Sequence, residues 1–166
     1  PEFWIKEIDL DFDLYETHTI VKTNLLVERN TEFSETENLY LNGVDLKLLS
    51  IAIDGVELSS DDYNYSDEIL TIKTAKNNFL LTTTVEIHPE SNESCEGLYK
   101  SGTIFCTQNE AEGFRKITFY PDRPDVMATF KTTIKADKKL YPILLSNGNK
   151  MDEGDLADGR HFASWE

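Results

Sequence analysis

The chain has 166 residues, of which 31 are Asp or Glu and 16 are Lys or Arg, so its formal net charge is −15. Such an excess of acid repels phosphate backbones and anionic lipid, which argues against nucleic acid and membrane surfaces as partners. The length is that of one ordinary domain, and a hydrophobic content of 39% favours a packed core over disorder.

The first half of the chain alternates apolar and polar residues with the period of two that is typical of β-strands. In Ile8 to Leu14 the polar positions are three aspartates, whose side chains we expect to face water. A polar turn at residues 15–19 leads into Val21 to Val27, so the two segments are predicted to form an antiparallel hairpin. A second hairpin is predicted around Asp54-Gly55, because this pair favours a tight turn between strands.

Further strands are predicted at residues 63–73 and 81–87. The latter ends at His88-Pro89, because proline cannot donate a hydrogen bond to the ladder. After residue 97, glycines and prolines interrupt the alternation, which predicts a long functional loop.

The last third of the chain returns to strand character at residues 129–136, 141–146 and 160–165. Helix is expected only as short turns at residues 110–116 and 126–128. The chain therefore predicts an all-β fold: an antiparallel β-sandwich or saddle-like domain with one long irregular region and little helix.

Two cysteines, Cys95 and Cys106, leave open a single disulfide or two thiols. Because so few cysteines make no disulfide framework, two reduced thiols in a cytoplasmic protein are the favoured interpretation. A zinc site built from this chain alone is not expected, because its three histidines lie far apart in the sequence. They are His18, His88 and His161.

Acidic residues offer two weaker hypotheses. Asp9, Asp11 and Asp13 resemble the start of a calcium loop, but Leu14 and Ile20 stand where that loop needs Gly and Glu. A solvated strand face is therefore the better interpretation. Paired carboxylates are inevitable among 31 acids, so a glycosidase stays open as the weakest functional alternative.

Three segments after residue 96 occur in a recognisable order. They are Gly97-Leu98-Tyr99, Thr107-Gln108-Asn109-Glu110-Ala111 and Asp122-Arg123-Pro124-Asp125-Val126. In order and spacing they resemble the N-terminal domain of bacterial aminopeptidase N. The resemblance covers nearly the whole chain, including Leu41-Asn42-Gly43 upstream and Tyr141-Pro142 downstream.

The resemblance implies a zinc metallopeptidase that removes single amino acids from the free N-termini of peptides. Residues 1–166 would be its N-terminal β-sandwich domain, and the chain still reads as a strand at Trp165-Glu166, which predicts a piece of a longer protein. The zinc-binding His-Glu-x-x-His helix of the family is absent from this sequence. We therefore expect no catalytic or metal-binding residue here, an inactive fragment, and two partners: the chain's own C-terminal catalytic domain and a peptide substrate.

The family resemblance assigns substrate-binding roles to two residues. Glu110 would help to hold the substrate α-ammonium, and Gln108 would line the pocket for the first side chain. Positions two apart in an extended segment share a face, so both could enter one cavity at the domain junction, and Asn109 would point away from them. Glu112 is expected to face solvent or to pair with a cation.

Four charged residues near this loop are expected to brace it by bidentate pairing rather than to touch substrate; they are Arg115, Asp122, Arg123 and Asp125. The alternative to the enzyme hypothesis is a free-standing, non-catalytic β-sandwich module that binds protein or carbohydrate through the irregular region. A coding frame that ends at Glu166 would favour the module, and one that continues into a His-Glu-x-x-His helix would favour the enzyme.

Overall fold

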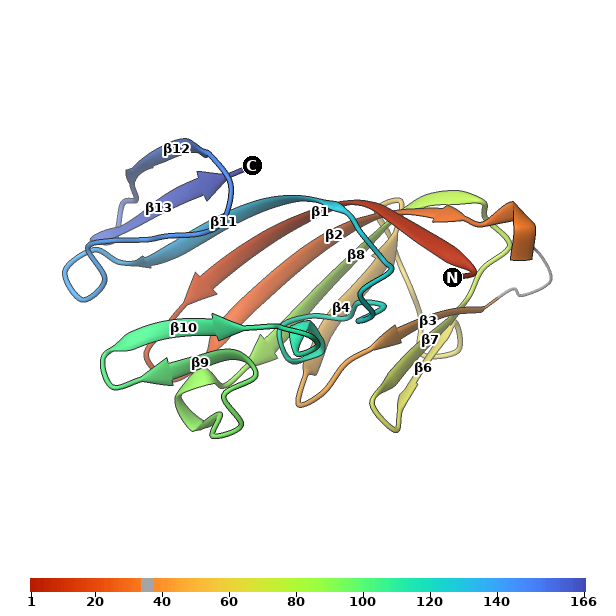
Figure 1. The fold of residues 1–166 in the computed structure, drawn as a ribbon, viewed down its shortest axis with the longest axis horizontal. Coiled ribbons are helices and arrows are strands. Elements are labelled where there is room, and N and C mark those ends of the chain that lie inside the picture. Colours follow the sequence, from red (N-terminus) through yellow and green to blue (C-terminus); the bar gives the residue numbers. More distant parts are fainter. Residues whose placement is uncertain (34–37) are drawn as a thin grey trace.

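The computed structural model describes residues 1–33 and 38–166, and these residues are mostly β (Figure 1). One large sheet contains β1 (Phe3–Leu14), β2 (Thr19–Arg29), β4 (Lys47–Ile53), β5 (Val56–Glu57), β8 (Asn78–Ile87), β11 (Thr129–Asp137), β12 (Lys150–Asp155) and β13 (Arg160–Trp165). Its strand order is β12-β13-β11-β1-β2-β8-β4-β5.

Two smaller sheets lie on one side of the large one, near its opposite ends (Figure 1). The first contains β3 (Asn38–Asn42), β7 (Ile69–Lys73) and β6 (Tyr63–Ser66), and the second contains β9 (Gly97–Ser101) and β10 (Ile104–Gln108). Helical structure is limited to the 3₁₀ turns η1 (Thr31–Phe33), η2 (Pro89–Ser91) and η3 (Phe114–Lys116). Among the residues described, no helix is long and apolar enough to cross a membrane. The all-β prediction is confirmed.

The predicted first hairpin pairs β1 with β2 along its whole length, from Phe3 beside Arg29 to Leu14 beside Thr19. A register shift between Ile5 and Glu7 places Ile5 and Ile8 on the same buried face although they are three positions apart. Most pairings in the large sheet are antiparallel, but β1 and β11 run parallel.

The main core lies between the large sheet and the two small ones. Inward-facing side chains of β1, β2 and β8 pack against those of β3 and β7 and against the segment around Phe119, which is fully buried. The side chains that form this interior include Ile8, Leu10, Val21, Leu25, Leu81, Val85, Leu41, Leu70 and Ile72. Burial of apolar surface is therefore what holds the small sheets against the large one.

The predicted turn at Asp54-Gly55 joins β4 to β5, with both residues at positive φ as a tight hairpin requires. The alternation predicted for β4 breaks at a register shift between Leu48 and Ser50, and Leu49 points outward as a result. Residues 63–73 form two strands rather than one, because Asp67 and Glu68 take left-handed conformations and turn the chain back.

The expectation that the β1 aspartates simply face water is wrong for two of them. Asp11 pairs with Lys135 of β11, with 2.6 Å between Nζ and Oδ2, and Asp13 pairs with Arg160 of β13. The two aspartate side chains are about one third exposed, and their ion pairs tie β1 to β11 and, across β11, to β13.

Two local predictions in the last third are also wrong. Residues 141–146 are extended but belong to no strand, and residues 126–128 form no helical turn. The sequence does not indicate the adjacent strand β12, because its residues are mostly polar and exposed and show no apolar alternation. Residues 141–149, called the strap below, instead run from Tyr141, which packs against Phe105 of β10, to Asn149, which pairs with Glu166.

Candidate functional site

The predicted long loop contains an ordered hairpin, in which β9 pairs with β10 from Gly97 beside Gln108 to Ser101 beside Ile104. The chain leaves β10 at Gln108, passes through residues 109–113 and enters η3 at Phe114. The Thr-Gln-Asn-Glu motif of the sequence therefore spans the end of β10 and the start of a short connecting loop.

Both predicted substrate-binding residues are exposed on this loop. Gln108 is the last residue of β10, and its Nε2 donates a hydrogen bond to the backbone oxygen of Glu110 at 3.2 Å. Within the described residues the Glu110 carboxylate has no ion-pair partner, so it is available to an external cation. The two residues lie next to each other on the surface, and their contact with a substrate stays a prediction.

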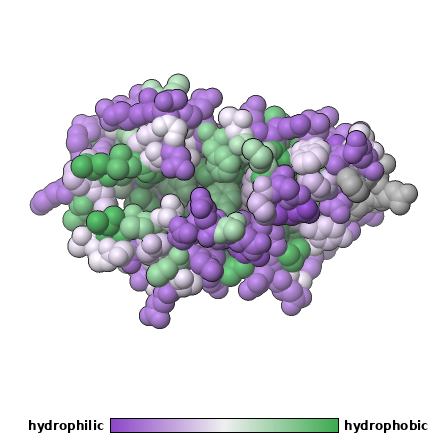
Figure 2. Space-filling model, in the orientation of Figure 1, coloured by the Kyte–Doolittle hydropathy of each residue, from purple (hydrophilic) through white to green (hydrophobic). Residues whose placement is uncertain are grey.

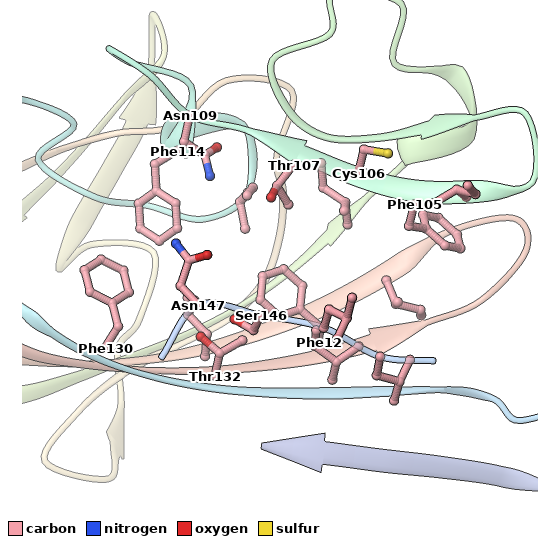
Figure 3. Close-up of a pocket in the computed structure, with 18 of the residues that line it drawn as sticks. Phe12, Phe105, Cys106, Thr107, Asn109, Phe114, Phe130, Thr132, Ser146 and Asn147 are labelled. Atoms are coloured by element: carbon pink, nitrogen blue, oxygen red, sulfur yellow. The ribbon is translucent and has the colours of Figure 1, made fainter. Parts of the chain in front are cut away.

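Asn109 projects to the other side of the loop, as the alternation predicts. It lines an apolar cavity of about 700 Å³, whereas Gln108 and Glu110 do not (Figure 3). The Oδ1 atom of Asn109 is buried and has no hydrogen-bond partner among the described residues. The two sides of the loop therefore differ in chemistry. The outer side presents the Glu110 carboxylate and the Gln108 amide, and the inner side presents the Asn109 amide to an apolar cavity.

A buried carboxylate holds the end of this loop. Asp122 Oδ2 accepts hydrogen bonds from the backbone nitrogens of Gly113 and Arg115, at 3.0 and 3.2 Å, and from Nε of Arg115 at 2.8 Å. The Arg115 guanidinium also pairs with Glu112, with 2.5 Å between the nitrogen and Oε2. The Asp122 carboxylate is the largest cause of a raised pKa at Arg115. Arg115 and Asp122 brace the loop as predicted, but not bidentately, because Arg115 contacts one carboxylate oxygen and the backbone oxygen of Asp122. The predicted pairing of Glu112 with a cation is confirmed.

The other predicted brace, Arg123 with Asp125, is bidentate. Nε lies 2.7 Å from Oδ1 and the second nitrogen lies 2.6 Å from Oδ2, although both side chains are about half exposed. The Arg123 hydrogen bond is the largest cause of a lowered pKa at Asp125. This pair closes its own turn and does not reach the Gln108–Glu110 loop.

Gly113 explains how the loop can turn so tightly. Its φ is 138°, and a Cβ at this position would lie 2.8 Å from the backbone oxygen of Gln108. Any other residue would therefore push against the backbone that carries Gln108 and Glu110.

The inner wall of the cavity comes from β1, β9, β10, β11, the Phe114–Val126 segment and the strap (Figure 3). No local sequence pattern indicates this cavity, because it depends on the β9–β10 hairpin and the strap, which approach each other only in the fold. The strap is tied at Tyr141, whose ring packs against that of Phe105 with 5.1 Å between centroids and whose hydroxyl donates to Glu16. Lys100 adds a 2.9 Å bond to Glu16, and the hydrogen bonds from Tyr141 and then Lys100 lower the Glu16 pKa.

Because Tyr120 is buried beneath the loop, we expect the domain to lose stability at high pH. Burial raises its pKa to about 12, from an ordinary value near 10. The stabilising effect is complete below about pH 10 and is lost as the pH rises through about 12, because the unfolded chain releases its proton first. Wild type is therefore expected to lose roughly 2 to 3 kcal/mol more than Tyr120→Phe between pH 9 and 12 in urea unfolding. Equal losses in the two proteins would contradict this assignment.

Neither the histidines nor the cysteines form a metal site in the described structure. No group of three or more His, Cys, Asp or Glu side chains there is arranged to hold a metal ion. Cys95 is exposed and Cys106 is partly buried on β10, and both are free thiols.

Comparison with known proteins gives a consistent result along the whole chain. The family model for the peptidase M1 N-terminal domain matches residues 5–166. Aminopeptidase N of Caulobacter vibrioides is 52% identical over 98% of this chain and 18% of its own length. Aminopeptidase N of Escherichia coli is 44% identical over 100% of this chain and 19% of its own. The chain thus spans about a fifth of the length of the curated relatives it matches.

Solved structures agree. Aminopeptidase A of Legionella pneumophila, determined in complex with aspartic acid, superposes with a TM-score of 0.94 at 32% identity, over 99% of this chain and 19% of that one. An M1 zinc metallopeptidase of Deinococcus radiodurans, bound to a Tyr-Ser-Ala substrate, shares the fold with a TM-score of 0.80. Its sequence is 12% identical, and the match covers 99% of this chain and 39% of that one. The resemblance seen in the sequence is confirmed, and the chain belongs to the peptidase M1 N-terminal domain family.

Proposed function

We propose that residues 1–166 form the N-terminal, substrate-recognition domain of a longer cytoplasmic zinc aminopeptidase, which releases single amino acids from the free N-termini of peptides. The observation that carries this proposal is the identity of 42–52% to bacterial aminopeptidase N over essentially the whole chain. The partner of the domain is then the catalytic domain that follows it in the same polypeptide.

The domain would contribute recognition of the substrate terminus. An α-ammonium group offers three hydrogen-bond donors and one positive charge, and the Glu110 carboxylate offers acceptors on a braced loop. Fixing the ammonium at one place sets the first peptide bond at a defined distance from the reacting centre. A blocked terminus would leave the carboxylate desolvated and unpaired, which disfavours internal peptide bonds. Gln108, beside Glu110, would border the first side chain.

The zinc ligands would belong to the catalytic domain that follows, and in keeping with this no group of three or more His, Cys, Asp or Glu side chains in the described residues is arranged to hold a metal ion. Zinc, when bound there, supplies an acidified water for hydrolysis. This chain would bind and orient the substrate, and residues 1–166 alone are expected to be inactive.

Metal removal and terminal blocking test the proposed activity. The complete polypeptide is expected to hydrolyse a dipeptide with a free amine and to lose that activity on treatment with 1,10-phenanthroline, with recovery after zinc is restored. The N-acetylated form of the same dipeptide should be cleaved at least a hundredfold more slowly, because its terminus carries no charge. Chromatographic measurement of the released amino acid gives both rates. Cleavage of neither substrate, or a coding frame that ends at Glu166, would favour the free-standing binding module instead, and equal cleavage of the two would refute recognition of the free terminus.

A further inference from the structure

The surface around the 700 Å³ cavity exposes apolar side chains toward solvent. Ile104 of β10 is 62% exposed, and Ile143 and Leu145 of the strap are 74% and 78% exposed. Figure 2 shows hydrophobic residues gathered in a hollow whose margins are hydrophilic. A small molecule lodged within the cavity would leave lining residues this exposed in contact with water, whereas a broad partner would cover them.

Charge is missing from this surface. Of the 22 described residues that line the cavity none is charged, whereas 28% of the whole chain is, so about six would be expected. A hydrophilic margin around an uncharged, apolar centre is typical of a protein interface, in which the rim is polar and the core is depleted in charge. An ionic ligand would find no counter-charge in the lining.

Two features of the cavity wall call for hydrogen bonds from a partner. The buried Oδ1 of Asn109 has no donor in the described part of the chain. β10, which contributes Ile104 to Thr107 to the lining, is paired with β9 alone among the described strands, so its other edge carries unpaired backbone groups. A polypeptide can supply N–H donors to both, whereas a hydrocarbon ligand cannot.

The position of the last residue points to the source of that polypeptide. The backbone of Glu166 forms two hydrogen bonds with Asn149 at the end of the strap, of 2.8 and 3.0 Å. The strap lines the cavity from Tyr141 to Asn147 with a gap only at Pro142, so whatever follows Glu166 starts close to the rim. In the curated relatives about four fifths of the length lies outside the region matched by this chain.

We propose that the cavity between β10, β11 and the strap is the seat of the polypeptide that follows Glu166 in the complete protein. This inference rests on the proposed function, because it requires the chain to be part of a longer polypeptide. The seated segment presents apolar side chains to Ile104, Ile143 and Leu145 and an N–H group to Asn109. The outward residues Gln108 and Glu110 remain free on the opposite side of the same loop.

Charged substitutions on the strap test the seat in the complete polypeptide. Leu145→Asp is expected to increase amide hydrogen exchange of β10 at least tenfold, because an aspartate cannot be covered by an apolar segment without large cost. Val56→Asp is the matched control: Val56 is 69% exposed on β5, at the far edge of the large sheet, and its replacement should leave exchange of β10 unchanged. In the 166-residue chain alone, Leu145→Asp should change exchange less than twofold, because Leu145 is already solvent-exposed there. Ile143→Asp should increase exchange of β10 in the same way and so tests the seat at a second residue of the strap.

Equal exchange of β10 in the 166-residue chain and the complete polypeptide would overturn the proposal. So would a concentration-dependent dimer of the complete polypeptide in sedimentation that Leu145→Asp abolishes, since a second copy would then be the occupant. The proposal would also be overturned if the complete polypeptide bound the apolar dye 8-anilinonaphthalene-1-sulfonate as strongly as the 166-residue chain does, because the cavity would then still be open. None of these measurements uses peptidase activity, so failure of the seat is distinguishable from failure of the proposed function.

Discussion

Replacing Glu110 with alanine in the complete enzyme is expected to lower kcat/KM for an aminoacyl anilide by about thirtyfold to a few thousandfold. The range corresponds to about 2 to 5 kcal/mol, which is the usual cost of removing one partner of a desolvated charge pair. In the isolated domain Glu110 is exposed and unpaired, so the same substitution should leave the free energy of unfolding within about 0.5 kcal/mol.

Two further variants separate recognition of the ammonium from general effects of charge. Glu110→Gln retains the shape and one acceptor but not the charge, and should fall between wild type and Glu110→Ala. Glu57→Ala removes an exposed carboxylate from β5 and should leave kcat/KM unchanged. An unchanged kcat/KM for Glu110→Ala, or an equal loss for Glu57→Ala, would refute the proposed role.

Asp122→Ala is expected to destabilise the domain by about 3 to 5 kcal/mol in guanidinium unfolding. The substitution leaves the Arg115 guanidinium without its main partner and removes the acceptor for two backbone N–H groups, one of them at Gly113. Because Gly113 ends the loop that carries Gln108 and Glu110, the KM of the complete enzyme should rise as well.

Asp125→Ala provides the control for this prediction. Its carboxylate also pairs with an arginine, but both side chains are about half exposed, so its loss should cost less than about 1 kcal/mol. Equal destabilisation by the two substitutions would show that burial of Asp122 does not matter and would remove the argument that it anchors the loop.

Much of the fold can be predicted from the sequence where strand alternation and turn chemistry agree. The β1–β2 hairpin follows from alternating residues on both sides of a polar turn, and β4–β5 follows from Asp54-Gly55, which tolerates positive φ at both positions. The β6–β7 turn uses Asp67 and Glu68 at positive φ, and no glycine announces it. Residues 141–146 are apolar enough to resemble a strand, yet packing of Tyr141 and Leu144 places them along a cavity instead.

The candidate site, like the fold, could be predicted from the sequence only in part. The loop residues Gln108 and Glu110 were identified through a motif of contiguous residues, and the bracing arginines through nearby opposite charges. The cavity was not predicted, because its walls come from segments as distant as Leu10 and Asn147, and no local pattern records that they meet. Nor does alternation reveal that the acceptor of Asn109 is buried, since this depends on the packing of the whole loop.

The parallel pairing of β1 with β11 has a consequence for biosynthesis. Glu7 lies beside Thr129 and Asp13 beside Lys135, so β1 borders a strand that is translated much later than β1 itself. A nascent chain can join β1 to β2 and β8 early, but one edge of β1 stays bare until β11 has been translated. Long loops of this kind slow folding and expose strand edges to wrong partners. The ion pairs Asp11–Lys135 and Asp13–Arg160 then favour pairing with β11 and β13. An apolar strand from another molecule would leave those aspartates unpaired.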